Sequence, residues 1–145
     1  MKRAFHRVLI PVPERWTPEI TMTLSGADTL RLTPVAPPGC TVIFLPDLNH
    51  PPDPEAALEG FVAGHTDGRE VLATSPTSVG TTTTGLPWAM REVASRGGSV
   101  WYCMYWALGV GDGVQCAVVC ASSKPGYDAL LPSIGPLFDA IEARP

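Results

Sequence analysis

The sequence has 145 residues and a mass of 15.4 kDa, which predicts one domain spanning residues 1–145. Apolar residues make up 45% and charged residues 17% of it, a balance that excludes an ordinary disordered chain. Ten basic against fourteen acidic residues give a net charge of −4 and no basic stripe, so we expect no nucleic-acid partner.

The N-terminus and the apolar runs predict a cytoplasmic protein without stable membrane insertion. Residues 1–7 begin with positive charge, as signal peptides do, but the apolar stretch stops at Pro11 and Pro13 without a small-residue cleavage site. The most apolar region, residues 99–108, is about half as long as the roughly 20 residues that a spanning helix needs.

The first 45 residues predict a meander of short strands. Apolar runs at 5–12, 19–24, 29–35 and 40–45 alternate with turn signals rich in proline, glycine, serine and aspartate. A helix is expected next, because Asp53 can cap it, Pro54 suits its first turn, and apolar residues then recur at helical spacing until Gly64 or Gly68.

The second half predicts more strands and a final helix. Runs at 71–73 and 79–84 flank Ser75 and Pro76, which indicates a broken or bulged strand. Three longer strands at 88–95, 100–108 and 114–121 follow as an antiparallel meander. Apolar residues then recur every three to four positions from 127 to 141, with a kink or restart expected near Pro132.

This order of elements predicts an α+β fold. We expect a twisted antiparallel sheet of about six to seven strands, with an N-terminal meander. The mid-chain helix and the C-terminal helix are expected to pack on one face of that sheet.

No motif predicts catalysis, a cofactor or a metal. The sequence lacks a nucleophile elbow, a zinc-protease motif and a phosphate-binding glycine loop, so we expect no enzyme activity and no cofactor. Asp47, Asn49, Asp53 and Glu55 carry oxygen ligands, but without the glycine that a calcium loop needs they fit a polar loop and a helix cap. Neither His50 nor His65 has a nucleophile or carboxylate close in sequence.

The four cysteines are expected to be free thiols that pack as small apolar side chains. They form no C-x-x-C pair, and the three histidines lie far from them in sequence, so the ligand pairs of a zinc site are missing. Cys116 and Cys120 are about 13 Å apart on one predicted strand, too far to bridge.

Aromatic residues predict a partner-binding face on the three-stranded meander. A two-residue turn at Gly97 and Gly98 pairs Arg96 with Ser99, and a five-residue loop at 109–113 sets the next register. One face then carries the five candidate contact residues: Trp88, Met90, Trp101, Tyr105 and Val119. In this register Cys103 lies opposite Val119, and Cys120 lies on the other face.

Both faces of this meander are apolar, whereas helices on one face leave the other open. Either the N-terminal strands and loops cover the second face, or it binds a partner. We expect the aromatic face to contact an apolar or helical segment of another protein, or a second copy of the chain.

Several motifs suggest a family. They are residues 11–16 after the opening strand, the helix after Asp53 and Pro54, residues 85–89, the aromatic strand at 101–105, and residues 127–132 opening the last helix. In this order they resemble the DcrB-related domain family, whose fold is shared with the photosystem II extrinsic subunit P. Pro132, Pro136 and the threonine run at 81–84 have no counterpart in that pattern, and no functional residue carries over.

The resemblance implies a non-catalytic role. Several bacterial members are small cytoplasmic chaperones or adaptors that hold apolar segments of type VI secretion effectors, typically as dimers. We therefore expect a secretion chaperone or adaptor that holds an apolar segment on its sheet face. The alternative is an immunity-type or structural partner that neutralises or scaffolds a toxin by docking, through a polar and charged surface.

Overall fold

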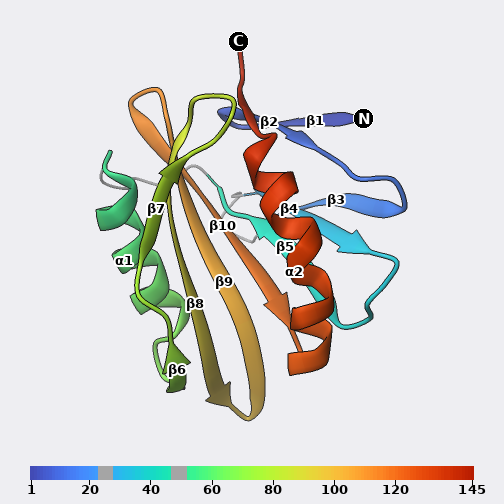
Figure 1. Ribbon diagram of the computed structural model, residues 1–145, viewed down its shortest axis with the longest axis vertical. Helices are drawn as coiled ribbons and strands as arrows, with labels where there is room; N and C mark the ends of the chain where they lie inside the picture. The colour runs from blue at the N-terminus through green and yellow to red at the C-terminus, as the bar shows by residue number, and fades with distance from the viewer. Residues whose placement is uncertain (23–27, 47–51) are drawn as a thin grey trace.

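The computed structural model describes residues 1–22, 28–46 and 52–145, which form two helices, one large antiparallel sheet and one small sheet (Figure 1). The predicted α+β fold class is confirmed. The large sheet has eight strands within the described residues, where six to seven were expected, in the order β3-β4-β5-β10-β9-β8-β6, with β7 also paired to β8. Its strands are β3 (Trp16–Met22), β4 (Asp28–Pro34), β5 (Cys40–Phe44), β6 (Glu70–Thr74), β7 (Ser78–Thr81), β8 (Pro87–Gly97), β9 (Ser99–Val110) and β10 (Gly113–Ala121).

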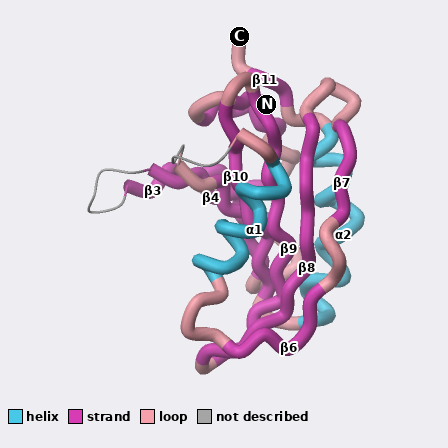
Figure 2. The backbone as a smooth tube through the Cα atoms, turned by 90° about the vertical axis from the view of Figure 1, so that its left-hand side faces the viewer, coloured by secondary structure: helices cyan, strands magenta, loops and turns pink. Residues whose placement is uncertain are grey.

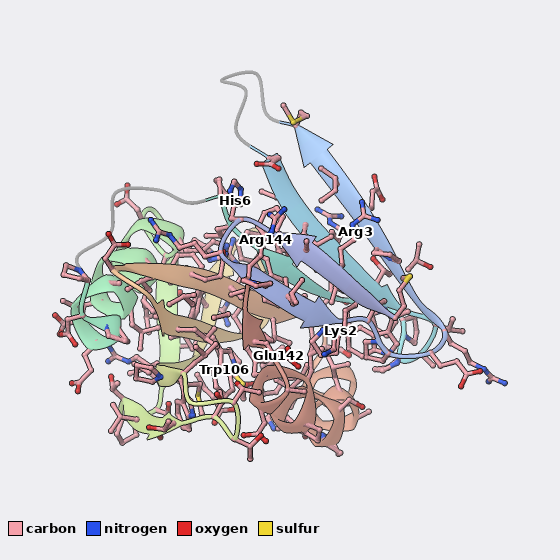
Figure 3. All side chains as sticks on the ribbon, turned by 90° about the horizontal axis from the view of Figure 1, so that it is seen from above. Lys2, Arg3, His6, Trp106, Glu142 and Arg144 are labelled. Atoms are coloured by element: carbon pink, nitrogen blue, oxygen red, sulfur yellow. The ribbon has the colours of Figure 1, made fainter. Side chains whose placement is uncertain are left out.

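The first predicted strand is instead a tight hairpin. Strands β1 (Lys2–Phe5) and β2 (Val8–Pro11) are joined through His6, whose φ of 48° places it in the left-handed region. The C-terminal strand β11 (Glu142–Ala143) pairs with β2 and completes the small sheet. Figure 3 looks onto this sheet, where the Lys2 ammonium lies 2.6 Å from the Glu142 carboxylate. The sheet closes one end of the core with Phe5, Val8 and Ile10.

The two helices lie on opposite faces of the large sheet, so the prediction that both pack on one face is wrong (Figure 2). Helix α1 (Pro54–His65) packs against Cys103, Tyr105 and Ala107 of β9. Helix α2 (Lys124–Asp139) packs against the alternate residues of the same strand, Met104, Trp106 and Leu108. The reason is that side chains alternate along a strand, and both sets on β9 are large and apolar.

The register of the meander differs by one residue from the prediction. Gly98 alone, with φ at 87°, lies between the paired residues Gly97 and Ser99. The following turn is also shorter, because Gly113 pairs with Val110. A slip of one residue moves every side chain of a strand to the other face of the sheet. The side chains of β8 and β10 therefore lie on the opposite face of the sheet from the one expected, when β9 is taken as the reference.

Each helix begins at a polar cap, and the cap at Asp53 is the one that the sequence predicts. The Asp53 carboxylate accepts the Ala56 N–H at 3.2 Å, and the Ser123 hydroxyl accepts the Gly126 N–H at 3.1 Å. Helix α2 runs through Pro132 and Pro136 as one element. Both prolines lie on its exposed side, where solvent can reach the backbone carbonyls that they leave without a partner.

The core side of α2 is fixed by an aromatic stack. The Phe138 ring lies parallel to the Trp106 ring, with 4.3 Å between centroids and 5° between planes, and 5.7 Å from the Phe44 ring. Phe138 is 0% exposed. This residue therefore joins α2 to strands from both halves of the sheet.

Replacing Phe138 with alanine is expected to lower the free energy of unfolding by about 3–5 kcal/mol, because the cavity lies between three packed elements. Urea denaturation measures this loss. Ser133→Ala, on the exposed side of the same helix, is the matched control and should change stability by less than about 0.5 kcal/mol. A loss below about 1 kcal/mol for Phe138→Ala would show that α2 is not anchored by this stack.

Candidate binding surface

The structure does not bring the five predicted contact residues onto one face. Trp88 and Met90 lie on the face that α2 covers in part, whereas Trp101 and Tyr105 lie on the α1 face. Val119 also lies on the α2 face. Both Val119 and Tyr105 are 0% exposed. The physical reason is the one-residue difference in register at each of the two turns.

Helix α2 leaves the β8 side of its face uncovered (Figure 1). Five partly exposed residues lie there, and we name them the β8 strip: Trp88, Met90, Glu92, Ala94 and Tyr102. The first four alternate along β8, and Tyr102 faces Ala94 from β9. Four of the five are apolar or aromatic, so the strip continues the core outward to the surface.

The Trp88 ring is held in place by its neighbours. It lies 5.0 Å from the Trp106 ring, and it covers Gly80 of β7, its partner across the strands. A Cβ atom at position 80 would lie 2.5 Å from the Trp88 ring, so only glycine leaves room for it there. The strip therefore presents a fixed aromatic surface, which loses little conformational freedom on binding.

A cleft of about 330 Å³ adjoins the strip, between α2 and β6. Apolar atoms make up most of its lining, from residues that include Ala73, Ala94, Tyr102 and Leu131. The volume is at the lower end of the range for ligand pockets, roughly 300–1,000 Å³. It is large enough for one or two apolar side chains.

Polar groups border this cleft. The Tyr127 hydroxyl donates to the Glu92 carboxylate at 2.6 Å, and Lys124 pairs with Asp128 at 2.6 Å one turn along α2. Burial, together with the adjacent Glu92 carboxylate, raises the pKa of Tyr127, which keeps this hydroxyl a donor at neutral pH. The cleft thus has an apolar floor and a fixed polar rim.

The outer edge of the strip is a strand broken at Ser75, as predicted. β6 pairs with one end of β8 and β7 with the other. Between them Ser75 donates its N–H to the Glu92 carbonyl and accepts the Glu92 N–H on its hydroxyl, both at 2.9 Å. The adjacent Pro76 has no N–H to offer another strand. The edge exposes three large apolar side chains, Val71, Leu72 and Val79.

Trp101 and Tyr105 take part in a different cluster, on the α1 face. The Tyr105 hydroxyl is 2.6 Å from His65 Nδ1, and the Arg69 guanidinium lies 3.4 Å above the centre of the Trp101 ring. Arg69 also donates to the Ser95 hydroxyl at 2.9 Å. Sequence reasoning missed this cluster, because His65 and Tyr105 are 40 positions apart and only the strand register shows their contact.

Sequence predictions about metal ligands are tested only in part. Asp53 caps α1, whereas Asp47, Asn49 and His50 lie outside the described residues. Within residues 1–22, 28–46 and 52–145, no three His, Cys, Asp or Glu side chains are grouped to hold a metal ion. Over the same residues, neither helix is long and apolar enough to cross a membrane.

Comparison with known proteins identifies the fold. No protein-family model matches the sequence, and no curated protein matches it. Among solved structures, cyanobacterial PsbP (CyanoP) from Synechocystis sp. PCC 6803 aligns over 99% of this chain and 92% of its own, with a TM-score of 0.68 and 9% identity. LpqN of Mycobacterium tuberculosis, described as involved in cell envelope biogenesis, aligns over 95% of this chain and 83% of its own, with a TM-score of 0.61 and 15% identity.

The chain has a PsbP-like fold. The broader part of the resemblance inferred from the sequence, to the fold of the photosystem II subunit P, is therefore confirmed. At these identities the likeness establishes the architecture alone, so the binding surface must be argued from this chain's own residues.

The environment of His65 predicts that stability falls in mild acid. Burial, with a smaller contribution from the Arg69 charge, lowers the pKa of His65 in the folded state. The unfolded chain then binds this proton first, at a pKa of about 6.5, so unfolding becomes easier as the pH falls below that value towards the folded pKa.

The free energy of unfolding of the wild type should therefore decline more steeply between about pH 7.5 and pH 5.5 than that of His65→Gln, which carries no titrating ring. Urea denaturation at a series of pH values measures both curves. Parallel curves for the two proteins would mean that His65 is not held neutral by the fold.

Proposed function

We propose that this protein is a non-catalytic binding protein that holds an apolar segment of a partner protein against the β8 strip and the adjoining cleft. Its class is the secretion chaperone or adaptor predicted from the sequence, acting in the cytoplasm. Of the five residues first expected to bind, Trp88 and Met90 belong to this surface. Trp101, Tyr105 and Val119 do not enter the proposal, because they pack on the α1 face or beneath α2.

The observation that carries the proposal is the incomplete cover of an apolar sheet face. The central residues of β9 and β10 are covered on both faces, but on the α2 side the apolar and aromatic residues of the β8 strip remain partly exposed. Contiguous apolar surface of this kind usually marks an interaction site in a monomeric protein. The fixed Trp88 ring, the adaptable Met90 side chain and the cleft supply an anchor, a variable contact and a pocket.

The shape of the surface favours a peptide segment as the occupant. The cleft accepts one or two side chains, and the strip extends from it along β8 as far as Trp88, so contacts are distributed along a line. A helix presents side chains at such intervals on one face. An apolar helical segment therefore fits this surface better than a small compact ligand does.

An immunity-type or structural role is the second candidate, supported by the charged rim. Glu92, Asp128 and Lys124 border the cleft and offer a docking toxin three charged groups. Binding through such groups weakens strongly with salt, whereas burial of apolar surface does not. Salt dependence therefore separates the two functions.

A labelled peptide tests the proposal: a helix of about 20 leucine and alanine residues with lysines at both ends, followed by fluorescence anisotropy. The wild type should bind it, with Kd changing less than about threefold between about 50 mM and 500 mM salt. Leu131→Asp and Ala94→Asp should each raise Kd at least about tenfold, because they place a charge in the apolar cleft.

The matched control is Val35→Asp, a substitution of the same kind at a residue that is 71% exposed and outside the strip. Its Kd should equal that of the wild type. Equal losses in all three variants, or no binding by the wild type, would contradict the proposed surface. Self-association that Leu131→Asp abolishes would instead identify a second copy of the chain as the occupant.

A further inference from the structure

Two cysteines face each other across the α1 face of the sheet. Cys103 of β9 pairs directly with Cys120 of β10, and their sulfur atoms are 3.2 Å apart. The expected register, with Cys103 opposite Val119 and Cys120 on the other face, is therefore wrong. All four cysteines are free thiols in this structure, but only these two, among the described residues, are in contact.

We propose that Cys103 and Cys120 form a reversible disulfide, and that the pair is a thiol oxidation site of this protein. Directly opposed residues of antiparallel strands have Cα atoms about 4.5–5.5 Å apart, within the roughly 4.4–6.8 Å that disulfides span. The sulfurs are already in contact, so rotation of the two side chains brings them to bonding distance without a change of backbone register.

The surroundings favour ionisation of Cys103 before Cys120. The hydrogen bond from Cys120, helped by Tyr105 and Arg69, lowers the pKa of Cys103 in spite of its burial. The same bond and burial raise the pKa of Cys120, so after the pair has lost one proton the other is held between the two sulfur atoms. Arg31 and Arg69 both lie near enough to stabilise a thiolate at Cys120.

Tyr105 lies between the pair and His65. It is two residues along β9 from Cys103 and helps to lower the pKa of that thiol, and its hydroxyl lies 2.6 Å from His65 Nδ1. His65 is partly exposed, and burial lowers its pKa, so its ring is neutral at pH 7 and can accept a hydrogen bond from the Tyr105 hydroxyl. This arrangement offers a route by which a thiol proton leaves the buried site.

The exposure of the two cysteines to solvent indicates which of them reacts first with an oxidant. Cys120 is the partly exposed residue of the pair, whereas Cys103 is 1% exposed. Transfer of the remaining proton from Cys120 to the Cys103 thiolate, across their 3.2 Å contact, leaves the negative charge on Cys120. The Cys120 thiolate then attacks one sulfur of a small-molecule disulfide, forming a mixed disulfide and releasing one thiolate. Cys103, after losing its proton, then attacks the Cys120 sulfur and releases the second thiolate. The two cysteines lose two electrons and two protons, and the oxidant becomes two thiols.

Glutathione disulfide is the probe for the test. After treatment of the folded wild type and denaturation with thiols blocked, the thiol count should fall from four to two. The product should be lighter by the mass of two hydrogen atoms, and tandem mass spectrometry of a chymotryptic digest should link Cys103 to Cys120. The melting temperature should rise by roughly 5–10 °C, because the bond closes the loop from 103 to 120 in the unfolded chain.

Three serine variants identify the pair. Cys116→Ser is the matched control, since Cys116 lies on the same strand and face as Cys120 but opposite Ala107. It should still lose two thiols, whereas Cys103→Ser and Cys120→Ser should not form an internal bond. A wild-type count that stays at four, a stable glutathione adduct, or a link through Cys40 or Cys116 would each overturn the proposal. The digest of the wild type decides the matter even if a variant fails to fold.

Discussion

Strand β9 is apolar on both faces, and this constraint organises the molecule. One set of its side chains requires cover from α1, and the alternate set requires cover from α2. Helix α1 precedes the three long strands in the sequence and α2 follows them, and the sheet lies between the two helices as a central layer (Figure 2). The β8 strip and the cysteine pair depend on which residues of β8 and β10 join each face, and two short turns decide this.

The turn at Gly98 has the larger consequence. By pairing Gly97 with Ser99 it places Trp88 and Met90 beside Trp106, on the α2 side. Helix α2 packs mainly over β5, β9 and β10, because its apolar stripe follows Phe138 onto Phe44 and Trp106. The β8 strip is the part of that face which one helix is too narrow to cover. The turn before β10 likewise brings Cys120 opposite Cys103, so both proposed sites follow from register.

Much of the fold could be predicted from local signals. The cap at Asp53, the break at Ser75 and the three long strands are encoded within a few residues, and each is present in the structure. The hairpin at His6 was missed because a non-glycine residue adopts positive φ there. A kink or restart was expected near Pro132, and the helix does not restart there, because Pro132 lies on its exposed side.

The binding surface and the thiol pair could not be predicted, because both depend on turn length. A Gly-Gly pair fits a two-residue turn as well as the observed one, and a single residue of difference exchanges the two faces. The contact between His65 and Tyr105 has no signal in the sequence near either residue. Composition predicted an apolar sheet, whereas the assignment of side chains to its faces required the three-dimensional register.

The register of β8 against β9 is therefore the claim to test most directly, and nuclear Overhauser contacts of the Met90 methyl group measure it. In this structure Met90 pairs with Trp106, so the methyl protons should show contacts with the Trp106 ring and none with the Tyr105 ring. Contacts with Tyr105 and none with Trp106 would show that Gly97 and Gly98 form a two-residue turn. They would place Trp88, Met90, Trp101 and Tyr105 on one face and contradict the assignment of Trp88 and Met90 to the α2 side.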